Sequence, residues 1–208
     1  MSDLQAVNRE IRERFDARMV AREQGLTSSR KAIRCCANSI RAIHRQEWDL
    51  ASALQAEARA ELDLAQGAMQ PFPEIYHAGF LHDAEKEYAE ARSTFAVIRG
   101  EPIPTPAECG VGDAAYLNGL SEVIGELRRC LLDVIRHGDL KRGEELLEAM
   151  DEIYFILVSI DYPDAITGGL RRSTDVARSI MERSRGDLSI TIAQERIRAA
   201  IEGRLDQS

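Results

Sequence analysis

The sequence lacks any hydrophobic run that approaches the ~18 to 20 apolar residues needed to span a bilayer. Its amino terminus, MSDLQAVNRE, is too polar for a signal peptide. Cysteine is scarce, because the chain has only four, with neither a CxxC pair nor the spacing of zinc ligands. We therefore expect a cytoplasmic protein outside the membrane, with buried or free thiols and with Cys35 and Cys36 as small core residues.

Positive charge is in deficit, with a formal net charge of -8 at pH 7 and a pI of about 5.2. This balance argues against a protein that coats nucleic acid with its whole surface, although it leaves room for a local basic patch. At 208 residues, 44% hydrophobic and 30% charged, the chain suits one domain with a sizeable core. We therefore treat residues 1–208 as a single domain.

No stretch alternates apolar and polar residues with period two over the length of a strand, whereas apolar residues recur at helical spacing almost throughout. The predicted helices cover residues 3–24, 30–44, 48–65, 80–98, 116–135, 140–160, 163–185 and 188–205. Gly25 offers a break or a new cap between the first two ranges. Taken together, the helical spacing along the chain predicts an all-α fold of about seven helices. Gly186 is predicted to begin the last helix, and the proline-rich segment 101–112 is predicted to be an exposed loop.

The predicted helix over residues 80–98 carries Asp83, Glu87 and Glu90 beside an apolar stripe. At about 100° per residue, these carboxylates centre roughly 90° from the middle of the stripe, at the edge of the buried face. A cluster held there needs a counter-charge, such as a divalent cation or a cationic partner group. The alternative is an ordinary solvated helix flank. The residues of the stripe are Phe80, Ala84, Tyr88, Ala91, Phe95 and Ile98.

Basic residues form a second pattern on the helix predicted over residues 30–44. Arg30, Arg34, Arg41 and Arg45 fall within about 60° of one another, opposite the apolar face. Four guanidinium groups in a row suit a nucleic-acid backbone, because arginine forks onto phosphate oxygens. The alternative is a solvated face paired with acids of a neighbouring helix.

Several longer segments follow one another in a distinctive order along most of the chain. They are SSRKAIRCCANSIRAIHRQEWDLA, KEYAEA, YLNGLSEVIGELRR with the HGD turn, LLEAMDEIYFIL and DYPDAITGGLRRSTDVARSIMERSRGDLSI. Their order and spacing resemble the translin family, which comprises translin and translin-associated factor X (Trax). The resemblance implies a seven-helix protomer that assembles into a closed octameric shell, with RNA or single-stranded DNA bound in its interior.

The resemblance also implies a catalytic type of subunit. Trax subunits are magnesium-dependent endoribonucleases that use carboxylates, and the two glutamates of the Trax segment QEFVEA match Glu87 and Glu90 in KEYAEA. The glutamate of the Trax segment TGEL matches Glu126 in IGEL, and an aspartate of the next helix aligns with Asp151 across a gap. Translin subunits lack the paired glutamates, so this chain is similar to Trax.

Phosphodiester hydrolysis benefits from a cation that offsets charge on the phosphoryl group and acidifies a bound water. Magnesium prefers hard oxygen ligands, and manganese can substitute for it. We therefore predict Glu87, Glu90, Glu126 and Asp151 as catalytic residues. Of these, Glu87, Glu90 and Asp151 are predicted metal ligands, and Glu126 is a ligand or a base beside the metal.

Three other interpretations compete with this one. A di-iron carboxylate bundle needs two Glu-x-x-His pairs, but only Glu74 with His77 has that spacing. A translin-like oligomer that binds RNA or single-stranded DNA without catalysis would use the same fold. The third is a scaffold whose homo-octamer merely buries apolar helix faces, and salt-sensitive binding of nucleic acid would count against it.

Overall fold

The computed structural model describes residues 4–205, and every regular element in that range is a helix. The all-α prediction is therefore confirmed, with six long helices and three short ones in the described part. The long helices are α1 (Leu4–His44), α2 (Trp48–Met69), α4 (Gly79–Arg99), α6 (Asp113–Arg136), α7 (Leu140–Ser159) and α9 (Leu170–Leu205). The short ones are α3 (Pro73–Tyr76), α5 (Pro106–Cys109) and α8 (Asp164–Thr167). None of these helices combines the length and apolarity that crossing a membrane would require.

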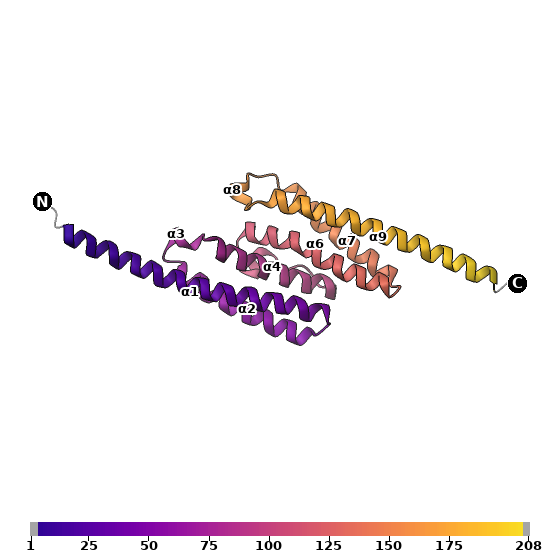
Figure 1. Ribbon diagram of the computed structural model, residues 1–208, viewed down its shortest axis with the longest axis horizontal. Helices are drawn as coiled ribbons and strands as arrows, with labels where there is room; N and C mark the ends of the chain where they lie inside the picture. Colours follow the sequence, from indigo (N-terminus) through magenta and orange to yellow (C-terminus); the bar gives the residue numbers. More distant parts are fainter. Residues whose placement is uncertain (1–3, 206–208) are drawn as a thin grey trace.

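The long helices lie side by side in an elongated bundle (Figure 1). The pairs α1–α2 and α6–α7 are helical hairpins, and α9 packs on both α6 and α7. The segment between α4 and α6 carries the chain back along the bundle, with α5 held by a capping box at Thr105 and Glu108. One core cluster joins α1, α2 and α4, and a second joins α6, α7 and α9. The interface between α4 and α6 therefore lies where the two halves of the bundle meet.

The predicted break at Gly25 is wrong, because α1 continues through it for 41 residues. Gly25 is buried against α2, where an added Cβ would lie 2.6 Å from Met69 Sδ. A glycine inside a helix costs only about 1 kcal/mol, which the packing of α1 on α2 outweighs. The predicted start at Asp3 lies outside the described residues.

The helix boundaries predicted near the carboxyl end also need correction. Gly186 does not begin a helix, because α9 runs through it from Leu170 to Leu205. The helix predicted from Pro163 instead ends at Thr167, since Gly168 and Gly169 have positive φ of 63° and 85°. In both places packing and backbone conformation, rather than the presence of glycine alone, decide where the helix ends.

The thiol and loop predictions are confirmed in the described residues. All four cysteines are free, and Cys35 and Cys36 are buried in the first core cluster. The segment between α4 and α6 is mostly exposed, but it contains the single turn of α5 and buries Cys109.

Both ends of the described chain project beyond the bundle, α1 at one end and α9 at the other (Figure 1). The projecting part of α1 exposes Val7, Ile11, Phe15 and Met19, which recur every four residues along one side of the helix. The far part of α9 exposes Ile190, Ile197 and Ile201. Contiguous exposed apolar side chains of this kind mark surfaces that another molecule covers.

Candidate carboxylate site

Gly119 of α6 packs directly against the backbone of α4. A Cβ added there would lie 2.6 Å from the carbonyl oxygen of Lys86 and 2.9 Å from the Cβ of Ala89. Any other residue at this position would push the two helices apart, because real Cβ atoms do not approach backbone this closely. Glycine at this position therefore brings the acidic side of α4 against α6.

At this contact the carboxylates of Glu87, Glu90 and Glu122 gather, with their nearest oxygens within 4.8 Å of one another. Glu90 is buried, Glu87 is half-buried and Glu122 is exposed. Lys86 Nζ lies 2.6 Å from Glu122 Oε1 and 3.7 Å from Glu87 Oε1. One ammonium group thus faces three carboxylates, so their charges are only partly compensated.

The electrostatics of the group reflect this imbalance. Burial, together with the nearby negative charges of Glu122, Glu87 and Glu126, raises the pKa of Glu90 to about 8. Burial also raises the pKa of Glu87, an effect that Lys86 opposes. A divalent cation would relieve this repulsion, and the oxygen donors are of the hard kind that magnesium prefers. The chemistry of the donor set therefore fits a magnesium or manganese ion.

The carboxylates of Glu90 and Glu122 border a cavity of about 400 Å³ between α4, α6 and α9. It is lined by Glu90, Ser121, Glu122, Gly125, Glu126, Arg172, Ser173, Val176 and Ile180. The acidic side chains come from α4 and α6, whereas α9 contributes the guanidinium of Arg172. A ligand in this cavity would thus meet groups of both charges.

Glu126 lines this cavity and is held from behind by α1. Its carboxylate is hydrogen-bonded to Nε2 of His44, a side chain that is only 6% exposed. The other ring nitrogen of His44 lies 3.4 Å from Cys130 Sγ, so the imidazole is fixed on both sides. The structure thus brings the predicted Glu126 to the cavity and adds His44, which the sequence did not indicate.

Asp151 is placed differently from the sequence-based expectation. It lies on α7, where its two oxygens accept hydrogen bonds from Arg185 Nη2 of α9 at 2.6 and 2.8 Å. It is not part of the group of three carboxylates, whose third member is Glu122. Glu122 precedes Glu126 by one helical turn, so the shared face of α6 was the sequence signal that could have identified it.

The other predicted positions are solvent-accessible. Asp83 is exposed one turn before Glu87 and adds to the negative field there. Arg30, Arg34, Arg41 and Arg45 are all exposed on α1. Arg41 donates to Asn38 at 2.8 Å and Arg45 pairs with Glu47, while α1 presents Arg30 and Arg34 to solvent.

The raised pKa of Glu90 predicts an unusual pH dependence of stability. Between its ordinary value of 4.5 and about 8, the folded chain binds this proton more tightly than the unfolded chain does. Without divalent metal, Glu90 should therefore make the free energy of unfolding fall as pH rises through this window. Glu90→Gln should flatten the slope, as measured by chemical denaturation in chelator between pH 5 and 8. Parallel slopes for the wild type and Glu90→Gln would contradict this prediction. The control is Glu148→Gln, since Glu148 is exposed on α7, and its slope should match that of the wild type.

Comparison with known proteins gives three relationships. The chain is 30% identical over 178 residues to an uncharacterized protein of Methanocaldococcus jannaschii, covering 85% of this chain and 79% of that one. It is similar to AfC3PO in complex with duplex RNA and to AfC3PO alone, each with a TM-score of 0.82 and 33% identity. These alignments cover 89% of this chain and 96% and 97% of those chains. Apo-NeC3PO matches with a TM-score of 0.75, and the alignment covers 92% of this chain and 98% of that one. Its sequence identity of 18% supports a shared fold alone. No family model matches the sequence.

Proposed function

The chain belongs to the translin family, and from that premise we propose that it is a metal-dependent endoribonuclease that acts within an oligomeric shell. The observation that carries this proposal is the group formed by Glu87, Glu90 and Glu122 beside an open cavity. Carboxylates in such a group repel one another, and a bound cation relieves that repulsion. The same cation can attract a polyanionic ligand into the cavity beside it.

Glu87, Glu90 and Glu122 are the residues that would hold the metal, with Glu126 at its edge. When bound, magnesium supplies an acidified water and offsets negative charge on the phosphoryl oxygens. Glu126 is held by His44 and would take the proton of the attacking water. Asp151 stays a ligand candidate on the sequence alignment alone, and its bond to Arg185 favours a structural role.

RNA is the proposed substrate because AfC3PO, at 33% identity, is known in complex with duplex RNA. Free thiols fit a reducing compartment, which supports a cytoplasmic location. The test is cleavage of a labelled single-stranded RNA with magnesium or manganese, with and without chelator, beside matched duplex RNA and single-stranded DNA. Chelator-sensitive cleavage of RNA is expected. Absence of cleavage, or cleavage that survives the chelator, would refute the nuclease.

A second candidate is a translin-like oligomer that binds RNA or single-stranded DNA without cutting it. The ion pair between Lys86 and Glu122 favours it, because an internal cation already compensates part of the acidic group. Salt-sensitive binding without metal-dependent cleavage would select this function. Binding of neither RNA nor DNA would leave a scaffold.

We propose that the protomers form a homo-octamer, because α1 exposes Val7, Ile11 and Phe15 on a projecting helix that the bundle does not cover. Light scattering at micromolar concentration should give about eight times the protomer mass of 23.2 kDa. Ile11→Glu combined with Phe15→Glu should lower the mass, since it puts charge into the apolar stripe. Arg9→Glu, an exposed position on the opposite side of α1, should leave the mass unchanged. A monomeric wild type would refute the assembly.

The arginines of α1 are proposed to track the phosphate backbone. Replacing Arg30 and Arg34 with Ala should weaken RNA binding uniformly across sequences and lower the salt slope of log K by about one to two units. The measurement is RNA affinity against salt concentration. Arg136→Ala combined with Lys141→Ala, exposed at the α6–α7 turn, should leave the slope unchanged. An unchanged slope in the α1 variant would mean that these arginines form an ordinary solvated face.

A further inference from the structure

Arg172 stands in the third position of α9, at a register fixed by contacts on both of its sides. Ser173 Oγ donates a hydrogen bond of 2.9 Å to Asn118 of α6, and Leu170 is buried in the second core cluster. Farther along, Arg128 of α6 bonds to Ser184 of α9 at 3.0 Å. The backbone at Arg172 is therefore held beside α6, and its side chain lines the same cavity as three glutamates.

The charge of Arg172 is uncompensated within the described part of the protein. Its guanidinium forms no ion pair with the carboxylates that line the cavity, nor a hydrogen bond with another described side chain. Other arginines of α9 are engaged, since Arg178 donates to Tyr154 and Arg185 to Asp151. Arg172 thus keeps all its donors available at an open cavity.

The position of Arg172 is also unfavourable for the helix itself. The first turn of α9 has no acidic residue, although helix amino termini favour negative charge by about 0.3–1 kcal/mol. The charge of Arg172, which lines the cavity, adds to the positive field of the helix amino terminus. An anionic group entering the cavity would neutralise that field.

We propose that Arg172 donates its guanidinium fork to the non-bridging oxygens of the RNA phosphate that is cleaved, an inference that rests on the proposed nuclease function. The planar fork matches two phosphate oxygens at once. The glutamates alone would repel a phosphate, and the guanidinium of Arg172, which lines the same cavity from α9, offsets that repulsion. Charge that builds on the phosphoryl oxygens during cleavage strengthens the same contact.

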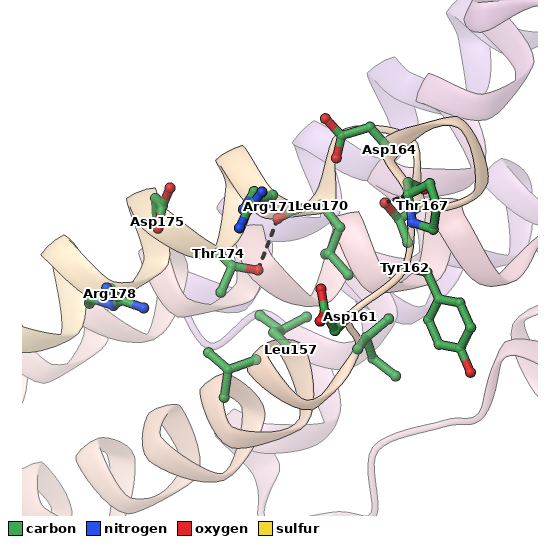
Figure 2. A pocket seen from close by; sticks show the side chains of 13 residues that line it. Leu157, Asp161, Tyr162, Asp164, Thr167, Leu170, Arg171, Thr174, Asp175 and Arg178 are labelled. Carbon is green, nitrogen blue, oxygen red and sulfur yellow. Dashed lines mark hydrogen bonds between the residues drawn. The ribbon is translucent and has the colours of Figure 1, made fainter.

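Arg171 is a matched control for this inference. It has the same charge, is exposed, and occupies the same first turn of α9. It lines a different cavity of about 690 Å³, between the end of α7 and the start of α9, with Asp161 and Asp175 (Figure 2). The two cavities share no lining residue, so loss of Arg171 tests for a general effect of charge on this helix end.

The experiment compares Arg172→Ala, Arg172→Lys and Arg171→Ala in the full oligomer. One readout is kcat and KM for cleavage of labelled single-stranded RNA with magnesium. The other is RNA affinity with calcium, chosen as a divalent ion that binds oxygen ligands without the geometry of magnesium. Arg172→Ala should lower kcat about 100-fold and affinity about threefold to tenfold. Arg172→Lys should recover part of the affinity but little kcat, and Arg171→Ala should stay within about twofold of wild type.

Equal kcat and affinity for Arg172→Ala and Arg171→Ala would overturn the inference. A loss of kcat that accompanies a lowered melting temperature only in Arg172→Ala would also overturn it, because Arg172 would then act on folding. If the wild type does not cleave RNA, the nuclease proposal fails by itself. The role of Arg172 is then decided by affinity alone, with a selective loss in Arg172→Ala supporting a phosphate contact.

Discussion

Replacing Glu90 with Gln is expected to lower the rate of RNA cleavage by at least about two orders of magnitude while RNA stays bound. Glutamine keeps the volume of the side chain and its capacity for hydrogen bonds, but it removes a buried negative charge from the proposed metal ligands. Loss of electrostatic stabilisation of this kind costs about 3 kcal/mol in other enzymes, which is roughly a hundredfold in rate. Affinity for RNA should be kept or rise, because the cavity repels phosphate less.

Glu87→Gln should behave in the same way, since Glu87 and Glu90 lie three residues apart on one face of α4. The assay is RNA cleavage over a range of magnesium concentrations, with RNA affinity measured in parallel. Cleavage by Glu90→Gln at the wild-type rate would remove this carboxylate from the mechanism.

The control for these variants must avoid Glu85, although it lies on the same helix. Glu85 is buried, and its carboxylate accepts hydrogen bonds from Gln66 at 2.7 Å and from the backbone of Gly112 at 3.4 Å. Glu85→Gln would therefore weaken the contact between α2, α4 and the start of α6. The exposed Glu148 of α7 is the better choice, and Glu148→Gln should cleave as wild type does.

A comparison of Glu122 with Asp151 is expected to give the second large effect. Glu122→Gln should reduce cleavage by about two orders of magnitude and shift the response to higher magnesium concentration, because it removes a member of the carboxylate group. Asp151→Asn should stay within about threefold of wild type, since its carboxylate is already bound by Arg185. The measurement is the magnesium dependence of cleavage for both variants. The opposite result would restore Asp151 as the ligand and exclude Glu122.

Lys86 provides a control for an indirect effect of Glu122. Its ammonium lies 2.6 Å from Glu122, so Glu122→Gln also disturbs this ion pair. Lys86→Gln breaks the same pair but leaves the carboxylates in place. If Lys86→Gln lost activity as severely as Glu122→Gln, the ion pair rather than metal binding would explain the loss. We expect Lys86→Gln to lower the rate of RNA cleavage by no more than about tenfold relative to the wild type.

The sequence by itself determined the helical class and much of the acidic helix. Apolar periodicity predicted a helix over residues 80–98, and α4 spans Gly79–Arg99, ending at a glycine with a positive φ of 71°. Periodicity also put Glu87 and Glu90 on one flank, because three residues along a helix turn the chain by about 300° and leave the two side chains only about 60° apart. These features depend on a single helix, and local geometry is sufficient to specify them.

Helix boundaries were less predictable where glycine was the signal. Gly25 and Gly186 each lie inside a continuous helix, whereas Gly168 and Gly169 separate α8 from α9. The difference is conformational and tertiary, since Gly25 packs on Met69 while Gly168 and Gly169 adopt positive φ. The sequence contains the same residue in each case, and its low cost in a helix lets the surroundings decide.

Only the tertiary structure decided which third carboxylate joins the site. In the sequence, Glu122 and Asp151 are both acids beside an apolar stripe, and each fits the same helical pattern. Periodicity fixes the direction of a side chain around its own helix axis, but it does not fix how far one helix slides along another. That register comes from packing: Gly119 admits the backbone of Lys86 and brings Glu122 to α4. On α7, the salt bridge from Arg185 instead turns Asp151 towards α9.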